Sequence, residues 1–178
     1  MDFDVHLIDR GRIEADANFV LDGSVVATAS EPNPDLEYAE FLVWNLVIDH
    51  PEATILFDTG SHPEAGDGYW PAPLYQAFAH VDATDHDLEA DLNAAGFELD
   101  DIDAVVMSHL HLDHAGGLYH FDGTDVPIYV HEREIEFAYR SAKTDSGSIA
   151  YFAPDFEHDL NWTVVEGDRQ LVSGVDLL

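Results

Sequence analysis

Four side chains that commonly bind metal ions fall within six consecutive positions: His109, His111, Asp113 and His114. In an extended chain, residues i and i+2 point the same way, so His109 and His111 can present both rings to one ion while Leu110 packs into the interior. A turn after His111 would let Asp113 and His114 face a second ion. Nitrogen and oxygen donors suit zinc, iron, manganese or cobalt, and zinc is expected for a site rich in histidine. The spacing therefore predicts a metal centre.

The elements that must hold this cluster are a strand before it and helices on either side. Residues 102–107 form the short apolar run of a buried strand, and Leu88, Leu92 and Gly96 predict an amphipathic helix that ends before it. The remaining runs predict strands over residues 4–8, 19–21, 41–49, 54–57, 127–130, 162–165 and 175–178, a helix over 132–142 and a surface loop over 61–73. Alternating strands and helices after a β-rich start favour an α/β sandwich.

The composition excludes several kinds of partner and site. The 178 residues include 37 Asp and Glu against 6 Lys and Arg, which gives a formal net charge of −31 at pH 7. Because that charge repels phosphate backbones and anionic lipid, we expect no nucleic-acid partner and no membrane partner. The absence of Cys excludes disulfides, thiol nucleophiles and Cys-bound metal. Length and a 46% apolar share fit one domain over residues 1–178.

The charge also predicts the solvent in which the protein works. In molar salt the screening length falls to ~3 Å, so the self-repulsion of an acidic surface largely disappears. The sequence holds a single Lys. We therefore expect a halophilic protein from a salt-rich cytoplasm, and the N-terminus lacks the basic and apolar regions of a secretory signal.

The segment 108–117 resembles the H-x-H-x-D-H signature of the metallo-β-lactamase superfamily. Residues 55–60 (ILFDTG), 100–106 (DDIDAVV) and 165–168 (VEGD) resemble the branch that contains the N-acyl homoserine lactonases. The resemblance implies a metallo-β-lactamase-like αβ/βα sandwich, of which the chain would hold the first half and the start of the second. In the resembling enzymes a T-P-G-H-like turn, absent here, supplies another metal ligand, so we expect the chain to be truncated at its C-terminus.

The resemblance also implies a role for each residue of the motif. His109 and His111 would bind the first of two divalent metal ions, expected to be Zn²⁺, and Asp113 and His114 the second. Two ions ~3.5–4 Å apart lower the pKa of a shared water, and the resulting metal-bound hydroxide would open a small-molecule lactone or ester. Asp113 would also act in catalysis by accepting the proton left on the attacking oxygen. Asp58 would steady the site by hydrogen bonds, or it is a simple turn residue after a strand.

Alternatives remain for the function and for the more distant residues. Another reaction on the same scaffold, such as thioester hydrolysis or iron-dependent oxygen chemistry, is one, and a catalytically inactive truncated remnant with weak metal affinity is another. No second histidine cluster is expected elsewhere. Three further sets of residues have two interpretations each. Extra metal ligands or surface histidines are His120, His131 and His158, and an acyl-chain wall or core is formed by Trp70, Pro71, Pro73, Leu74 and Tyr75. A helix face that is either core or a contact surface, with core favoured, holds Ile135, Phe137 and Ala138.

Overall fold

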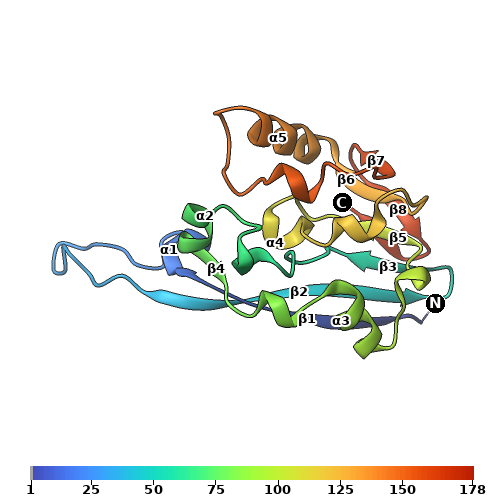
Figure 1. Ribbon diagram of the computed structural model, residues 1–178, viewed down its shortest axis with the longest axis horizontal. Coiled ribbons are helices and arrows are strands. Elements are labelled where there is room, and N and C mark those ends of the chain that lie inside the picture. Colours follow the sequence, from blue (N-terminus) through green and yellow to red (C-terminus); the bar gives the residue numbers. More distant parts are fainter. Residues whose placement is uncertain (1) are drawn as a thin grey trace.

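The computed structural model describes residues 2–178, which form a mixed sheet with helices packed against it (Figure 1). Its strands are β1 (Asp4–Asp16), β2 (Tyr38–His50), β3 (Ala53–Phe57), β4 (Phe78–His80), β5 (Ala104–Val106), β6 (Ile128–His131), β7 (Trp162–Val165), β8 (Arg169–Val172) and β9 (Val175–Leu177). Its α-helices are α1 (Ala17–Val20), α2 (Ala72–Ala77), α3 (Leu88–Ala95), α4 (Leu112–Ala115) and α5 (Glu132–Lys143). Short 3-10 helices are η1 (Ala65–Asp67), η2 (Ala83–Asp85), η3 (Leu99–Asp101), η4 (Leu118–Phe121) and η5 (Ala153–Asp155).

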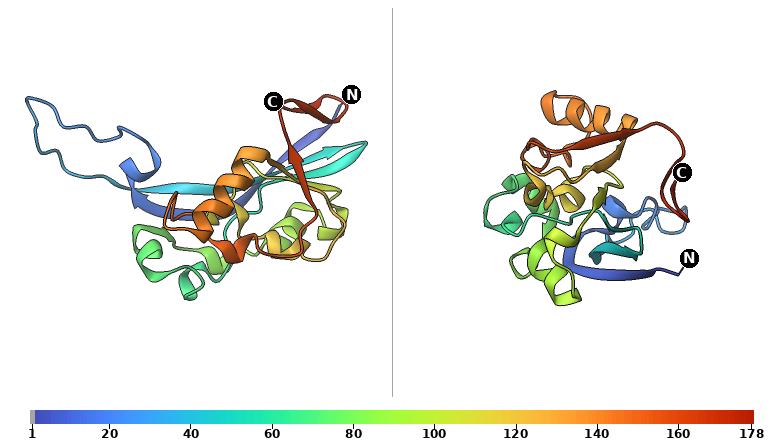
Figure 2. Two further views of the ribbon diagram at one scale, coloured as in Figure 1. Left: turned by 90° about the horizontal axis from the view of Figure 1, so that it is seen from above. Right: turned by 90° about the vertical axis from the view of Figure 1, so that its right-hand side faces the viewer.

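Seven strands form the main sheet in the order β4-β1-β2-β3-β5-β6-β7. The strands β1, β2 and β3 pair antiparallel in sequence order, whereas β3, β5, β6 and β7 run parallel. Helix α3 lies beside β1, α5 packs over β6 and β7, and the segment between α1 and β2 projects from the body (Figures 1 and 2). The carboxyl ends of the parallel strands therefore share one edge, where loops gather side chains from distant parts of the chain.

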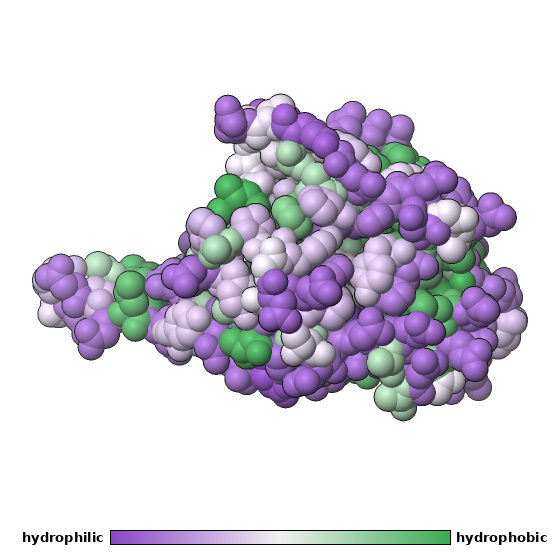
Figure 3. All heavy atoms as spheres, in the orientation of Figure 1, coloured by the Kyte–Doolittle hydropathy of each residue, from purple (hydrophilic) through white to green (hydrophobic). Residues whose placement is uncertain are grey.

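The inner face of the sheet holds the main core. Val47, Leu56 and Val105 from three strands are fully buried there against Leu92 of α3 and Ala138 of α5. On the outer face, the β8–β9 hairpin packs over β3 and β5. The face of the molecule seen in Figure 3 is mostly hydrophilic, as the acidic composition requires. Within residues 2–178, no helix has both the length and the apolar character needed to cross a membrane.

A backbone irregularity lets β1 continue to Asp16, whereas the sequence predicts a strand that ends at residue 8. The register with β2 shifts between Asp9 and Arg12, and Gly11 lies there with φ +91°. Only glycine adopts that conformation readily, so the strand bends and then continues to Asp16. The helix predicted from Leu88, Leu92 and Gly96 and the helix predicted over 132–142 are confirmed, with Asp87 capping α3 and Gly96 ending it in the left-handed conformation.

Three predictions from the sequence are wrong. Residues 19–21 do not form a strand, because the Asp16 side chain accepts the Asn18 N–H and begins the short helix α1. The segment 61–73 is not a surface loop throughout: it contains η1 and the start of α2, and Trp70 is 1% exposed in the core. The expectation of core at Phe137 also fails, since that ring is 40% exposed at the edge of α5 while Ala138 is buried.

Candidate metal centre

The predicted ligands follow the carboxyl end of β5, and the predicted supporting residue Asp58 follows that of β3. Asp58 follows β3 directly, and the loop with His109 and His111 follows β5. These strands are parallel neighbours, and the Asp58 N–H donates to the Val106 carbonyl (2.9 Å). Parallel pairing thus brings two segments that are 50 residues apart in sequence to one place.

One backbone hydrogen bond, one side-chain hydrogen bond and a glycine pair hold the loop against the turn after β3. The Thr59 N–H and hydroxyl both donate to the His114 carbonyl, at 2.8 and 2.7 Å. A Cβ on Gly116 would lie 2.1 Å from the His62 nitrogen, and one on Gly117 would lie 2.6 Å from the Thr59 carbonyl oxygen. The double glycine is therefore required for this close backbone approach.

The structure brings the three predicted histidines together. The ring centroids of His109 and His111 are 4.5 Å apart, and those of His109 and His114 are 3.9 Å apart. Leu110 is fully buried between the first two, as the i, i+2 spacing predicts. Its N–H donates to Glu134 Oε1 of α5 (2.8 Å), which fixes the loop from the other side. Glu134 carries no motif signal, so the sequence did not reveal this role.

Asp58 and Ser108 orient two of these rings. Asp58 is 2% exposed and accepts the Ser108 N–H (2.7 Å), the Ser108 hydroxyl (2.7 Å) and His114 Nδ1 (2.8 Å). Because the hydroxyl proton points at Asp58, Ser108 Oγ accepts from His109 Nδ1 (2.9 Å). Both rings then carry their proton on Nδ1 and leave the Nε2 lone pair free. This is the arrangement that metal-binding histidines require.

The electrostatics differ across the cluster. Burial, together with the neighbouring rings of His114 and His111, lowers the pKa of His109 to about 4. Burial also lowers the pKa of His111. Burial acts in the same direction on His114, but the hydrogen bond to Asp58 and the nearby Asp113 outweigh it and raise the pKa of His114. Two of the three rings are therefore neutral near pH 7, the form in which histidine binds metal.

The four donor residues form two pairs, and each pair fits one divalent ion. His114 Nε2 and Asp113 Oδ2 are 3.5 Å apart, close to the roughly 3.4 Å that separates two ligands of a tetrahedral ion with bonds of about 2.1 Å. His109 and His111 form the other pair. Across residues 2–178, no group of three or more His, Asp or Glu side chains is already arranged to hold an ion. The assignment of His109, His111, Asp113 and His114 as metal ligands stays a prediction.

A cleft of about 430 Å³ opens beside this cluster. Its polar wall consists of the predicted ligands and Ser148, and its apolar wall is made by Phe19, Val20, Leu74, Phe78, Leu112, Ile149 and Ala150. Of the five residues considered for an acyl-chain wall, only Leu74 lines the cleft. The sequence did not reveal Phe19, Phe78 and Ile149, which reach the cleft from three separate segments.

The extra histidines have other places. His131 caps α5 by accepting the Arg133 N–H on Nδ1 (3.1 Å). His120 lies beside Asp87 (3.5 Å) rather than the cleft, and burial lowers its pKa. His158 Nε2 is buried without a hydrogen-bond partner among the described residues. None of the three lines the cleft as residues 2–178 form it.

Comparison with known proteins agrees with the motif. The Metallo-beta-lactamase superfamily profile matches residues 39–176. An N-acyl homoserine lactonase, AiiB of Agrobacterium fabrum, is 35% identical over 181 residues, which cover 97% of this chain and 65% of the relative. An N-acyl homoserine lactonase of Bacillus thuringiensis is 32% identical over 162 residues, which cover 89% of this chain and 60% of the relative. The chain thus spans about 65% or less of the length of these relatives.

A solved structure shows the same fold. It is an N-acyl homoserine lactone hydrolase with the product N-hexanoyl-L-homoserine at its catalytic metal centre, and it is 28% identical with a TM-score of 0.75. The match covers 98% of this chain and 64% of that one. The profile match, the fold and the position of the histidine loop agree, and the chain belongs to the metallo-β-lactamase superfamily.

Proposed function

We propose that the protein is a metal-dependent hydrolase that opens a lactone or ester, with an N-acyl homoserine lactone as the candidate substrate. The observation that carries the proposal is the cleft in which the predicted ligands face an apolar wall. A lactone with an acyl chain needs both surfaces, a polar centre for the ring and an apolar wall for the chain. The lactonases among its relatives support the same substrate class.

The chain's own residues divide the work. His109 and His111 would hold one ion, and Asp113 and His114 the other, with Zn²⁺ the expected metal. Bound divalent ions supply a nucleophile at neutral pH and polarise the substrate carbonyl. Asp113, 17% exposed at its side chain, would accept the proton released on attack. Asp58 and Ser108 keep the Nε2 atoms of His109 and His114 directed away from their hydrogen-bond partners.

The apolar wall would receive the acyl chain. The rings of Phe19 and Phe78 lie 5.7 Å apart and stand beside Leu74. Among the described residues that line the cleft, none is Lys or Arg, so the wall carries no cation for a phosphate or sulfate. A neutral lactone or ester is therefore the favoured substrate class.

The test is a lactone-opening assay in molar KCl with zinc present. His109→Ala removes a predicted ligand and is expected to abolish turnover. His131→Asn lies outside the cleft and still offers an acceptor that caps the helix, so this variant should retain turnover. Phe78→Ala should raise KM more for a long-chain than for a short-chain lactone, since it removes part of the apolar wall. Equal turnover in wild type and His109→Ala would overturn the assignment.

A further inference from the structure

Three side chains outside the histidine loop converge where β1 bends. His80 ends β4, Asp82 follows it, and His86 comes directly after η2. His80 Nε2 lies 3.3 Å from Asp82 Oδ1, and His86 Nε2 lies 3.9 Å from Asp82 Oδ2. A Cβ on Gly11 would meet all three, at 2.4 Å from Asp82 Oδ1, 2.6 Å from His80 Nε2 and 2.7 Å from His86 Cδ2. The glycine in the bend is what leaves room for them.

His80 is a buried polar group without a partner. Its side chain is 1% exposed, and neither ring nitrogen makes a hydrogen bond within residues 2–178. Its Nε2 faces the Asp82 carboxylate without the alignment of a hydrogen bond. Buried polar atoms in proteins are almost always satisfied, so an orphaned imidazole aimed at a carboxylate calls for a further group between them. Burial also lowers the pKa of His80 to about 4, which keeps the ring neutral.

His86 is oriented in the way that metal ligands are oriented. Its Nδ1 lies 3.3 Å from Asp91 Oδ2, and Asp91 in turn forms an ion pair with the buried Arg10. A carboxylate on Nδ1 places the proton there and leaves the lone pair on Nε2, which is the nitrogen that faces Asp82. The side chain is 18% exposed. Because no three such side chains within residues 2–178 already surround an ion, the His86 ring would turn further toward Asp82 as the ion binds.

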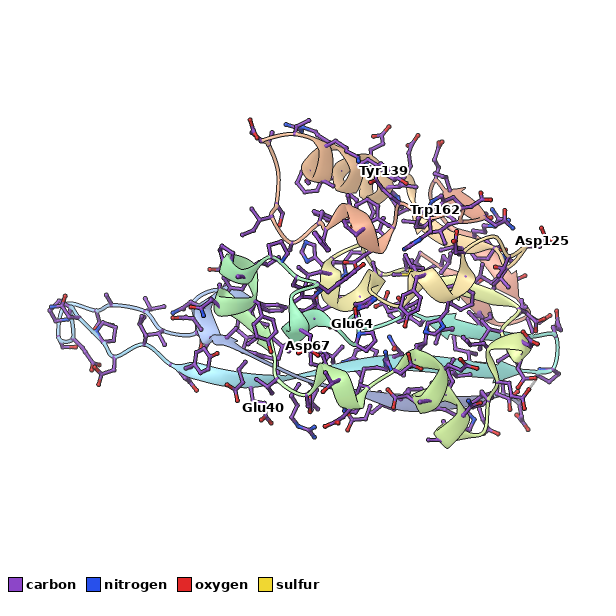
Figure 4. The ribbon with its side chains drawn as sticks, in the orientation of Figure 1. Glu40, Glu64, Asp67, Asp125, Tyr139 and Trp162 are labelled. Carbon is purple, nitrogen blue, oxygen red and sulfur yellow. The ribbon has the colours of Figure 1, made fainter. Side chains whose placement is uncertain are left out.

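Asp82 is held from one side and open on the other. Its Oδ1 accepts the Arg12 N–H (2.7 Å), and Arg12 Nη1 lies 3.5 Å from Oδ2. Arg12 also pairs with Glu40 (3.3 Å), which is labelled on the lower side of β2 in Figure 4. The Asp82 side chain is 27% exposed, so an ion can reach the carboxylate from solvent.

We propose that His80, Asp82 and His86 form a second metal site, for zinc or another first-row divalent ion, separate from the histidine loop. Two imidazoles and one carboxylate are a common donor set for such ions, and the remaining position would hold water. The site links β4 and the segment after it to the bend in β1, and its role is to stabilise that edge of the sheet. Nothing in it depends on lactone hydrolysis.

The test follows the imidazole ¹⁵N resonances of His80 while Zn²⁺ is added to chelator-treated protein. In wild type, zinc is expected to shift the His80 Nε2 resonance. In His86→Ala the same shift should need about 100-fold more zinc. Even the loss of a residue that only supports a ligand lowers metal affinity by about 10–100-fold. In His109→Ala the His80 shift should persist, because that variant alters only the other centre. His131→Asn is the matched control for loss of an unrelated ring.

Metal content gives a second readout that does not depend on activity. His86→Ala, which leaves the buried His80 in place, should bind one zinc equivalent fewer than wild type, and Asp82→Asn should do the same. A His80 resonance that does not move with zinc in folded wild type would overturn the proposal. Unchanged zinc content in His86→Ala would also overturn it, and the cluster would then only stabilise the fold through contacts among its side chains. If the protein does not open lactones, the proposed function fails, but the His80 shift and the zinc content still test the second metal site.

Discussion

Replacing Asp58 by Asn isolates the role of one carboxylate. Asn is nearly the same size and tolerates the left-handed backbone of this residue (φ +59°), so the fold should persist. The amide oxygen can still accept the Ser108 N–H, and the Ser108 hydroxyl can turn to accept from the amide nitrogen. His114 Nδ1, at 2.8 Å, then faces a donor instead of an acceptor.

The expected effect is on metal affinity. To bond the amide nitrogen that Asp58→Asn introduces, His114 must move its proton from Nδ1 to Nε2, the nitrogen that would bind the ion. Metal binding must then break this hydrogen bond, which costs about 1–3 kcal/mol. That range agrees with the roughly 10–100-fold loss of metal affinity that accompanies removal of such partners. We therefore expect Asp58→Asn to weaken zinc binding at the histidine loop by about that factor.

The assay is competition for zinc with a chromogenic chelator in molar KCl, with thermal unfolding measured on the same samples. Asp103→Asn is the matched control, because Asp103 also accepts a backbone N–H (Thr54, 2.8 Å) but lies near the opposite end of β3. It should bind zinc like wild type. Equal zinc affinity in Asp58→Asn and Asp103→Asn, with both folded, would refute the reasoning about tautomers.

Three further predictions concern stability. Raising KCl from 0.1 M to 2 M shortens the screening length from about 10 Å to below 3 Å, so the Tm of a chain with charge −31 should rise; a Tm that does not move contradicts the halophilic expectation. Gly116→Ala places a Cβ 2.1 Å from the His62 nitrogen, and because backbone cannot yield easily, calorimetry should show a loss of about 3 kcal/mol. Burial raises the pKa of Asp155 to about 8, so the native state keeps a proton that the unfolded state releases above about pH 4. Stability should therefore fall by about 1.4 kcal/mol per unit as pH rises from 4 to 8, and Asp155→Asn should remove that slope.

Controls accompany these measurements. Gly116 has φ −64°, so its alanine variant carries no left-handed backbone strain and the loss of stability reports the clash alone. For Asp155, the same pH series on Asp145→Asn, in the segment after α5, should retain the slope of wild type. A slope that survives in Asp155→Asn would assign the pH dependence to another group.

The local sequence pattern was sufficient to predict the geometry of the histidine loop. A six-residue segment carries its own geometry, so the approach of His109 to His111 and the burial of Leu110 follow from the period of an extended chain. The helices α3 and α5 were likewise predictable, because each shows a helical period and α3 also has clear capping residues. The role of Asp58 could not be predicted from its turn alone, because it depends on the parallel pairing of β3 with β5, which brings Asp58 to the histidine loop.

Features assembled from distant segments were not predictable in this way. The cleft wall combines Phe19 of α1, Phe78 of β4 and Ile149 of a loop, and no local period relates these positions. The approach of His80 to His86, on which the proposed second site rests, was not predictable for the same reason. His80 and His86 are six residues apart, and they approach each other only because η2 turns the chain and Gly11 opens the opposite strand. The spacing His-x-Asp with a third residue four positions later was the available signal.

The bonds between the turn after β3 and the histidine loop also bear on how fast a bound ion could leave. The Asp58 N–H, the Thr59 N–H and the bridge from Gly60 to Ala115 tie the loop to the sheet along its length. Freeing His114 therefore requires opening part of the β3–β5 pairing, which lies in the middle of the sheet, where amide exchange is expected to be slow. Ion release should consequently follow the rate of that opening. Its rate should reach a plateau as chelator concentration increases, with amide exchange in β3 and β5 proceeding on the same timescale.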